Sequence, residues 1–380
     1  MQQQKSYFAS IELIRFVSAF LIIVFHAFYG WKKNFGYPHF ITDSAGQLSS
    51  FGKLVENAIH NLSLGVDVFF LISGFVITHI LLSEKERTEK INFGRYFLYR
   101  ALRILPLFYI VLAITPVYNH FFHEASPNYL SFIFGMGNFE LIKHGWGAAT
   151  VNPLWTLCIE MQFYFLWPFV IAFIPKQKLN HFFVTVILIS IIFRASVFHQ
   201  DNWWMSIYIH SLSRMDVIAI GSMIAFWYHN NKNVSVNIPR IIRIIIYSVF
   251  IYVYVHDDIG YLDSIFLVTV KKYFYAGVIT FAFINYLFNP TAMFSISDKN
   301  PLQRLGKITY GLYIFNILVV ALVIKTFKTY NLQNMLLYYT IIITAALVVA
   351  TISYNFIEKP FLNLRNKIKI PKMFLKKPEN

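Results

Sequence analysis

The sequence has few charged residues and a single cysteine. Charged side chains make up 13% of its 380 residues, about half the share of roughly 25% that is typical of soluble domains, whereas 57% of the residues are hydrophobic. One cysteine, Cys158, excludes an internal disulfide framework, and its place in an apolar segment indicates a packing role. We therefore expect a polytopic membrane protein and not a soluble one.

Acidic residues are scarce as well. The chain has 18 Asp and Glu residues against 33 Lys and Arg residues, which gives a formal net charge of +15. Nucleic-acid-binding proteins also have such a basic excess, but here the basic residues lie in short loops and toward the C-terminal end. In these positions they set membrane topology and contact anionic lipid. We expect contact with a lipid bilayer and no nucleic-acid partner.

Motifs that mark several enzyme classes are missing. The sequence has no Gly-x-Ser-x-Gly nucleophile motif, no phosphate-binding loop and no dinucleotide-binding glycine pattern. His120, His123 and Glu124 are of metal-ligating types, but they fall in a polar loop. We therefore expect no metal site.

Ten apolar runs are each about 20 residues long, which is the length that crosses a hydrocarbon core of about 30 Å. They lie at approximately 8–28, 62–82, 101–119, 154–174, 180–199, 207–228, 240–256, 264–287, 308–326 and 335–356. The loop charges predict the orientation, because Lys and Arg are enriched on the cytoplasmic side. The sequence thus predicts an all-α polytopic protein with about ten transmembrane helices and both termini in the cytoplasm. Residues 1–361 would form one transmembrane domain, and residues 362–380 a basic cytoplasmic tail.

The first span, 8–28, carries three ionisable residues, Glu12, Arg15 and His26. Ionisable groups inside a membrane are costly and are usually functional. Arg15 and His26 are eleven residues apart, which is three helical turns plus about 20°, so both lie on one face about 16 Å apart along the axis. Glu12 lies on the same face, one turn before Arg15. The pattern indicates either a functional polar seam or an ion pair with a hydrogen-bonded core histidine.

A basic cluster is predicted near the cytoplasmic face. Arg100 and Arg103 lie one helical turn apart at the inner end of the third span, at the depth of Arg15. Planar guanidinium groups bind phosphate oxygens in a bidentate manner. The cluster therefore suits an anionic ligand, although anchoring to lipid headgroups would also explain Arg100 and Arg103.

Acidic residues are predicted near the opposite face, at the depth of His26. They are Asp67, Glu160 and Asp216. A histidine with a carboxylate at the same depth is the minimal arrangement for a general base. We therefore expect His26, Asp67 and Glu160 to be catalytic residues. Pairing with Arg214 or with backbone groups would explain Asp216, and also Glu160, without a catalytic role.

Several motifs together resemble the acyltransferase-3 family, and they occur in the family's order from residue 8 to about residue 361. They are Arg15 with His26, Gly65 to Phe75, Arg100 with Arg103, Trp155 to Tyr164, Arg214 with Asp216, Thr309 to Tyr313, and Phe356 to Pro360. The sequence departs from the family pattern at Asn316, where many members have histidine. A C-terminal esterase-like domain, which some members carry, is also not expected here.

The resemblance implies a multi-pass acyltransferase of the bacterial inner (cytoplasmic) membrane. Such an enzyme moves an acetyl group, or a longer acyl group, from cytoplasmic acyl-CoA to a hydroxyl of an envelope saccharide, and needs no metal. Carried over by position, His26 is the catalytic histidine, Arg15 its partner in the motif, and Arg100 and Arg103 contact coenzyme A. Acetyl-CoA is the expected donor. The acceptor stays open among O-antigen of lipopolysaccharide, capsule, exopolysaccharide, peptidoglycan and small lipid-linked sugars.

Two mechanisms and two competing functions follow from these residues. His26 either deprotonates the sugar hydroxyl for direct attack or accepts the acyl group first. The main alternative function is a secondary transporter with an intramembrane proton or anion path. Inverted repeats would favour a transporter, and the sequence shows none. A non-catalytic membrane scaffold would leave His26 and Arg15 unexplained.

Overall fold

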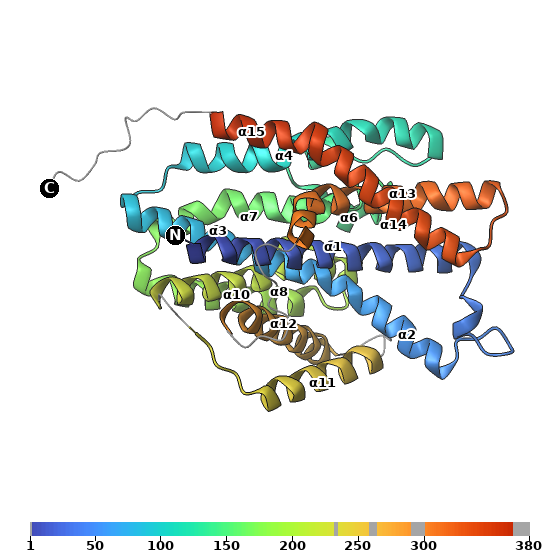
Figure 1. Ribbon diagram of the computed structural model, residues 1–380, viewed down its shortest axis with the longest axis horizontal. Coiled ribbons are helices and arrows are strands. Elements are labelled where there is room, and N and C mark those ends of the chain that lie inside the picture. The colour runs from blue at the N-terminus through green and yellow to red at the C-terminus, as the bar shows by residue number, and fades with distance from the viewer. Residues whose placement is uncertain (1, 232–234, 258–263, 290–300, 368–380) are drawn as a thin grey trace.

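The structure is a bundle of long helices that run side by side along the long axis of the molecule (Figure 1). It is a computed structural model that describes residues 2–231, 235–257, 264–289 and 301–367. These residues form helices and connecting turns and contain no β-strand. The predicted all-α polytopic fold is confirmed.

Nine helical segments within the described residues are long and apolar enough to cross a bilayer. They are built on α1 (Gln2–Phe35), α3 (Gly65–Thr88), α4 (Phe93–Phe122), α7 (Leu154–Phe173), α8 (Leu179–Val197), α10 (Ser211–Asn230), α12 (Ile265–Phe288), α13 (Thr309–Thr329) and α14 (Met335–Ser353). The shorter helices are α2 (Ser50–His60), α5 (Tyr129–Ile133), α6 (Gly137–His144), α9 (Trp203–Ile209), α11 (Arg240–His256) and α15 (Lys359–Lys367). Short 3₁₀ segments are η1 (His39–Ile41), η2 (Asn61–Leu64), η3 (Lys176–Lys178) and η4 (Pro301–Ile308), and η5 (Tyr354–Glu358) is a π-helix.

The tenth predicted span is present as a helix but is short. α11 has 17 residues, or about 25 Å at 1.5 Å per residue, against a hydrocarbon core of about 30 Å. It packs against α2 and α12 and lies at the lower edge of the bundle in Figure 1. The beginning of α1 and the end of α15 lie at the same end of the bundle. That this end is cytoplasmic, and that a tail begins at residue 362, stay predictions, and residues 368–380 of that tail lie outside the described residues.

The closest helix packing is between α3 and α10. A Cβ atom added to Gly74 would lie 2.0 Å from the carbonyl oxygen of Ile218, and one added to Gly221 would lie 2.0 Å from that of Leu71. Small residues at helix crossings allow backbones to approach in membranes, where dispersion contacts replace the hydrophobic effect as the driving force. The glycine pair therefore makes α3 and α10 one rigid unit inside the bundle.

A second unit is held by buried charge. Arg194 of α8 donates a hydrogen bond of 2.8 Å to Asp216 of α10, and both side chains are 0% exposed. Lys272 of α12 lies 3.1 Å from the other carboxylate oxygen, and the Tyr273 hydroxyl donates to Asp216 at 3.0 Å. Asp216 therefore joins three helices, which agrees with a structural role, but its partners are Arg194, Lys272 and Tyr273 and not Arg214, the partner that the sequence indicates.

The remaining helices enclose the site described below. α1 packs against α3, α13 and η4. A Cβ atom at Gly306 of η4 would lie 2.4 Å from the Cβ of Glu12, so η4 rests directly on α1. After α14 the chain continues through η5 into α15, which packs against α4. This path brings residues from both ends of the chain to one place.

Candidate functional site

A cavity of about 260 Å³ lies inside the bundle, among α1, α3, α4, α7, α13 and the segments η4, η5 and α15. Its lining combines apolar, hydroxyl and charged side chains. The charged residues are Glu12, Arg15, Arg103, Glu160, Lys307 and Glu358, and the hydroxyl residues are Thr156, Tyr164, Thr309, Tyr310, Tyr313 and Tyr354. Three carboxyl groups and three basic groups thus line one partly open cavity within the helix bundle.

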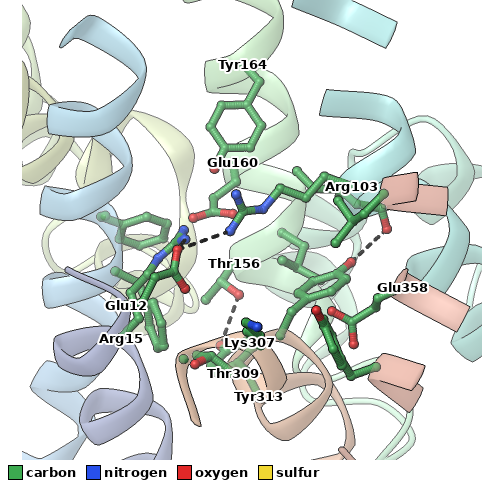
Figure 2. A pocket seen from close by; sticks show the side chains of 18 residues that line it. Glu12, Arg15, Arg103, Thr156, Glu160, Tyr164, Lys307, Thr309, Tyr313 and Glu358 are labelled. Atoms are coloured by element: carbon green, nitrogen blue, oxygen red, sulfur yellow. Dashed lines mark hydrogen bonds and ion pairs between the residues drawn. The ribbon is translucent and has the colours of Figure 1, made fainter. Parts of the chain in front are cut away.

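Glu12 lies beside Arg15 in the cavity wall, and the guanidinium group of Arg103 extends toward it (Figure 2). Its Oε1 atom is 3.7 Å from Nη1 of Arg15, one helical turn further along α1, and 3.9 Å from Nη2 of Arg103 on α4. The ion pair therefore links α1 to α4. Arg15 is also within electrostatic range of Glu160 and Tyr164, and its Nε atom is buried without a hydrogen-bond partner among the described residues.

Arg100 lies beside the cavity and not in its wall. Its guanidinium carbon is 5.8 Å from the ring centroid of Tyr96 and 5.7 Å from that of Tyr164, which is the range of cation–π attraction. It is within electrostatic range of both Arg15 and Arg103. The structure thus gathers the three arginines that the sequence indicates, two of them in the wall and one behind Tyr164.

Glu160 of α7 also lines the cavity. The Ser73 hydroxyl donates a hydrogen bond of 2.6 Å to its Oε1 atom, and the Ser73 and Tyr164 hydroxyl oxygens are 3.3 Å apart. Two further hydroxyl groups are fixed nearby. Thr156 donates to the Tyr313 hydroxyl at 3.0 Å, as Figure 2 shows, and Tyr310 donates to the carbonyl oxygen of Ile104 at 2.8 Å.

His26 and Asp67 lie elsewhere. His26 is half-buried on α1, does not line the cavity, and has the Phe25 ring 5.0 Å away, centroid to centroid. The structure gives its imidazole no hydrogen bond or ion pair with a described residue. Asp67 accepts a hydrogen bond of 2.8 Å from Arg214, whose Nε atom donates to the carbonyl oxygen of Tyr208 at 2.6 Å. The structure therefore pairs Asp67 with Arg214 and not with His26, because α10 packs directly on α3.

Glu358 is a cavity residue to which the sequence analysis assigns no role. Its side chain is 8% exposed, and the Ser353 hydroxyl donates to it at 3.3 Å. It ends the π-helix η5, and π-helical turns are frequent at functional sites. The Phe356 to Pro360 motif marks the position, but only the fold shows that it faces Arg103 across the cavity. Lys307 and Thr309 also line the cavity, and the sequence analysis assigns no role to them either.

No metal-binding cluster is found in the described part of the chain, where no three His, Cys, Asp or Glu side chains gather as a metal ion requires. The absence of a metal from the working protein stays a prediction. The charged groups of the cavity instead have the chemistry of an anion site, with guanidinium donors on two helices and a carboxylate between them.

Comparisons with known proteins bear on the whole chain. It is 24% identical over 386 residues to Peptidoglycan O-acetyltransferase OatA of Listeria monocytogenes, an alignment that covers 94% of this chain and 56% of the relative. It is 27% identical over 327 residues to O-acetyltransferase OatA of Staphylococcus aureus, with 78% of this chain and 52% of the relative covered. The chain spans about half the length of these curated relatives. No solved structure matches it.

The family assignment follows from a broader match. The sequence profile of the acyltransferase-3 family, described as an acyltransferase domain, matches residues 8–355. This range contains α1 from residue 8 onward, α2 to α14 and nearly the whole cavity wall, including Glu12, Arg15, Arg103 and Glu160. The resemblance noted in the sequence is thereby confirmed, and the chain belongs to the acyltransferase-3 family.

Proposed function

We propose that this chain is a membrane O-acetyltransferase. It moves an acetyl or other short acyl group from cytoplasmic acyl-CoA to a hydroxyl of a cell-envelope saccharide, and it resides in the bacterial cytoplasmic membrane. The observation that carries the proposal is the family match over residues 8–355. A family fold alone does not specify chemistry. The charged cavity within the membrane-spanning helices is therefore a second, independent support.

The cavity suits one part of an acyl-CoA donor. Its volume of about 260 Å³ is below the roughly 300–1,000 Å³ of pockets that enclose whole drug-sized ligands. Arg15 and Arg103 would bind donor phosphate oxygens, with Arg100 behind them, since guanidinium forks match phosphate geometry. The rest of the donor would then extend out of the cavity along the helices.

His26 would perform the proton transfer. In direct transfer, one imidazole nitrogen takes the proton of the sugar hydroxyl while its oxygen attacks the thioester carbonyl. The carbon–sulfur bond breaks, the acyl group forms an ester, and the imidazolium returns the proton to the coenzyme A thiolate. In the two-step alternative the imidazole carries the acyl group before the sugar attacks. Its nitrogen atoms, which form no hydrogen bond or ion pair with a described residue, are free for either role.

The other candidate residues would have different roles. Glu160 lines the cavity beside Arg15 and would orient the donor or share a proton. Asp67 would act by holding Arg214 (2.8 Å). Asn316 is buried and donates to the carbonyl oxygen of Tyr313, and it takes no part in the proposed step.

The acceptor is proposed from the relatives. One relative is named a peptidoglycan O-acetyltransferase, which makes peptidoglycan the first acceptor to test, ahead of O-antigen, capsule, exopolysaccharide and lipid-linked sugars. Because the alignments cover only about half of each relative, the assays use both purified protein and intact cells.

Acetyl transfer from radiolabelled acetyl-CoA tests the proposal. The purified protein in lipid nanodiscs is incubated with each candidate saccharide, and label in the saccharide is counted. We expect transfer by the natural chain and none by His26→Ala, with both proteins equally folded by size-exclusion and thermal denaturation. His60→Ala is the matched control, because this histidine bonds to Tyr29 (3.3 Å) outside the cavity. Transfer by His26→Ala at the natural rate would refute the role of His26, and absence of any transfer or hydrolysis would refute the enzyme itself.

A further inference from the structure

Glu12 has only loose contacts for a carboxylate inside a helix bundle. One of its oxygens is 3.7 Å from Arg15 and 3.9 Å from Arg103. Charge-assisted N–H···O hydrogen bonds are about 2.7–2.9 Å long, so both contacts are ion pairs without a hydrogen bond. No described residue donates a hydrogen bond to Glu12. Its attraction to the two arginines is therefore purely electrostatic.

The other two carboxyl groups of the cavity are held more firmly. Glu160 accepts a hydrogen bond from Ser73 at 2.6 Å, and Glu358 accepts one from Ser353 at 3.3 Å. Both residues are buried, whereas the Glu12 side chain is 35% exposed. Of the three, Glu12 is the carboxylate that an incoming anion can replace with the smallest loss of existing contacts.

The two arginines have donors to spare for such an anion. A guanidinium carries five N–H donors, and the Nε atom of Arg15 is buried with no partner in the described part of the chain. The Arg103 side chain is 40% exposed and so open to a ligand. A phosphate bound by both would lie where the Glu12 carboxylate now faces them (Figure 2).

The backbone of Glu12 is fixed while its carboxylate is not. A Cβ atom at Gly306 would lie 2.4 Å from the Glu12 Cβ and 2.8 Å from its carbonyl oxygen, so η4 leaves α1 no room to shift at this point. An anion that enters must therefore turn the Glu12 side chain away from the arginines. It cannot displace the helix.

We propose that Glu12 competes with the donor's phosphate groups for Arg15 and Arg103. When the site is empty, its carboxylate offsets one of the two positive charges. A phosphate that binds both arginines must replace this carboxylate, so Glu12 lowers the affinity of the site for the donor. The inference rests on the proposed function, since it takes the donor to be an acyl-CoA.

Equilibrium binding of coenzyme A to the full-length protein in nanodiscs tests this role. We expect Glu12→Gln to bind coenzyme A about tenfold more tightly than the natural chain, because one negative charge within a few ångströms of a bound phosphate is removed. Binding of pantetheine, which has no phosphate, should not change. Glu12→Ser removes the same charge with a smaller side chain and should give the same direction.

Two controls separate this role from a general change in charge. Glu358→Gln removes one negative charge from the same cavity but from a hydrogen-bonded carboxyl group, and should give a smaller gain. In the Arg15→Gln/Arg103→Gln background, Glu12→Gln should give no gain, because the two cations for which Glu12 and the phosphate compete are then gone.

The outcomes distinguish a failure of the inference from a failure of the proposed function. Tighter binding that disappears in the double-arginine background supports the inference. Unchanged or weaker binding by Glu12→Gln, an equal gain with Glu358→Gln, or failure of both Glu12 variants to fold overturns it while the enzyme assignment stands. If the natural chain neither binds coenzyme A nor transfers acetyl groups from acetyl-CoA, the proposed donor is wrong, and the inference falls with it.

Discussion

Replacing Asp67 with leucine would leave Arg214 as an unpaired charge inside the bundle. The two side chains are 12% and 8% exposed and are joined at 2.8 Å, so water cannot take the place of the lost carboxylate. Removing one partner of a buried ion pair costs about 3–5 kcal/mol, whereas replacing both with apolar residues is often neutral. We therefore expect Asp67→Leu to lower the free energy of unfolding by about 3–5 kcal/mol.

The double variant Asp67→Leu/Arg214→Met distinguishes a structural from a catalytic Asp67. If Asp67 acts by holding Arg214, the double variant should recover most of the lost stability, since neither charge then remains buried alone. Unfolding of the purified protein in mixed micelles, followed by circular dichroism against increasing sodium dodecyl sulfate, measures both free energies. Acetyl transfer is measured in parallel.

Two results would refute this reasoning. A loss of less than about 1 kcal/mol for Asp67→Leu would mean that the pair behaves like an exposed salt bridge. A double variant that is as stable as the natural chain but has no acetyl transfer would show that the Asp67–Arg214 pair takes part in the chemistry and is not only structural.

Two further predictions concern helix packing and donor binding. Gly221→Ala should destabilise the protein by about 1–3 kcal/mol, because the new Cβ would lie 2.0 Å from the Leu71 carbonyl oxygen. The control is Gly277→Ala, which should not destabilise the protein because no atom lies within 4 Å of the added Cβ. Equal denaturation curves for the two variants would contradict the close packing. Arg103→Gln should weaken coenzyme A binding about tenfold or more, since hydrogen bonds to charged groups contribute about 1.5–3 kcal/mol. Isothermal titration calorimetry measures the dissociation constant. An unchanged value would place the donor phosphates elsewhere.

Hydropathy predicts where helices cross the membrane, because apolar length has a direct physical meaning there. It does not predict where they end. α4 begins at Phe93 and not near residue 101, since the segment that carries Arg95 and Arg100 continues the helix. Likewise, α1 extends to Phe35, beyond the apolar run at 8–28. Polar residues continue a helix as readily as apolar ones once it has been nucleated.

The sequence predicts the depth of a residue within the membrane, but it does not predict which residue of another helix lies next to it. Arg15 and Arg103 were expected at one level, and the structure places both in one cavity wall. His26 and Asp67 were also expected at one level, yet Asp67 is paired with Arg214. Which helices are adjacent depends on packing such as that of Gly74 on α10, and no local pattern encodes it. Glu358 enters the site for the same reason.

The buried Arg194, Asp216 and Lys272 have a consequence for how the protein is inserted during synthesis. A lone arginine or lysine costs up to about 2.5–3.5 kcal/mol to insert into a bilayer, which is the value for the centre of a helix. α8 with Arg194 emerges first, and α10 brings its counter-ion Asp216 22 residues later. When α12 delivers Lys272, the same carboxylate is already in place at 3.1 Å. These three helices therefore depend on one another for stable insertion. Loss of Asp216 would leave α8 and α12 with an unpaired buried charge and would make both less stably inserted during synthesis.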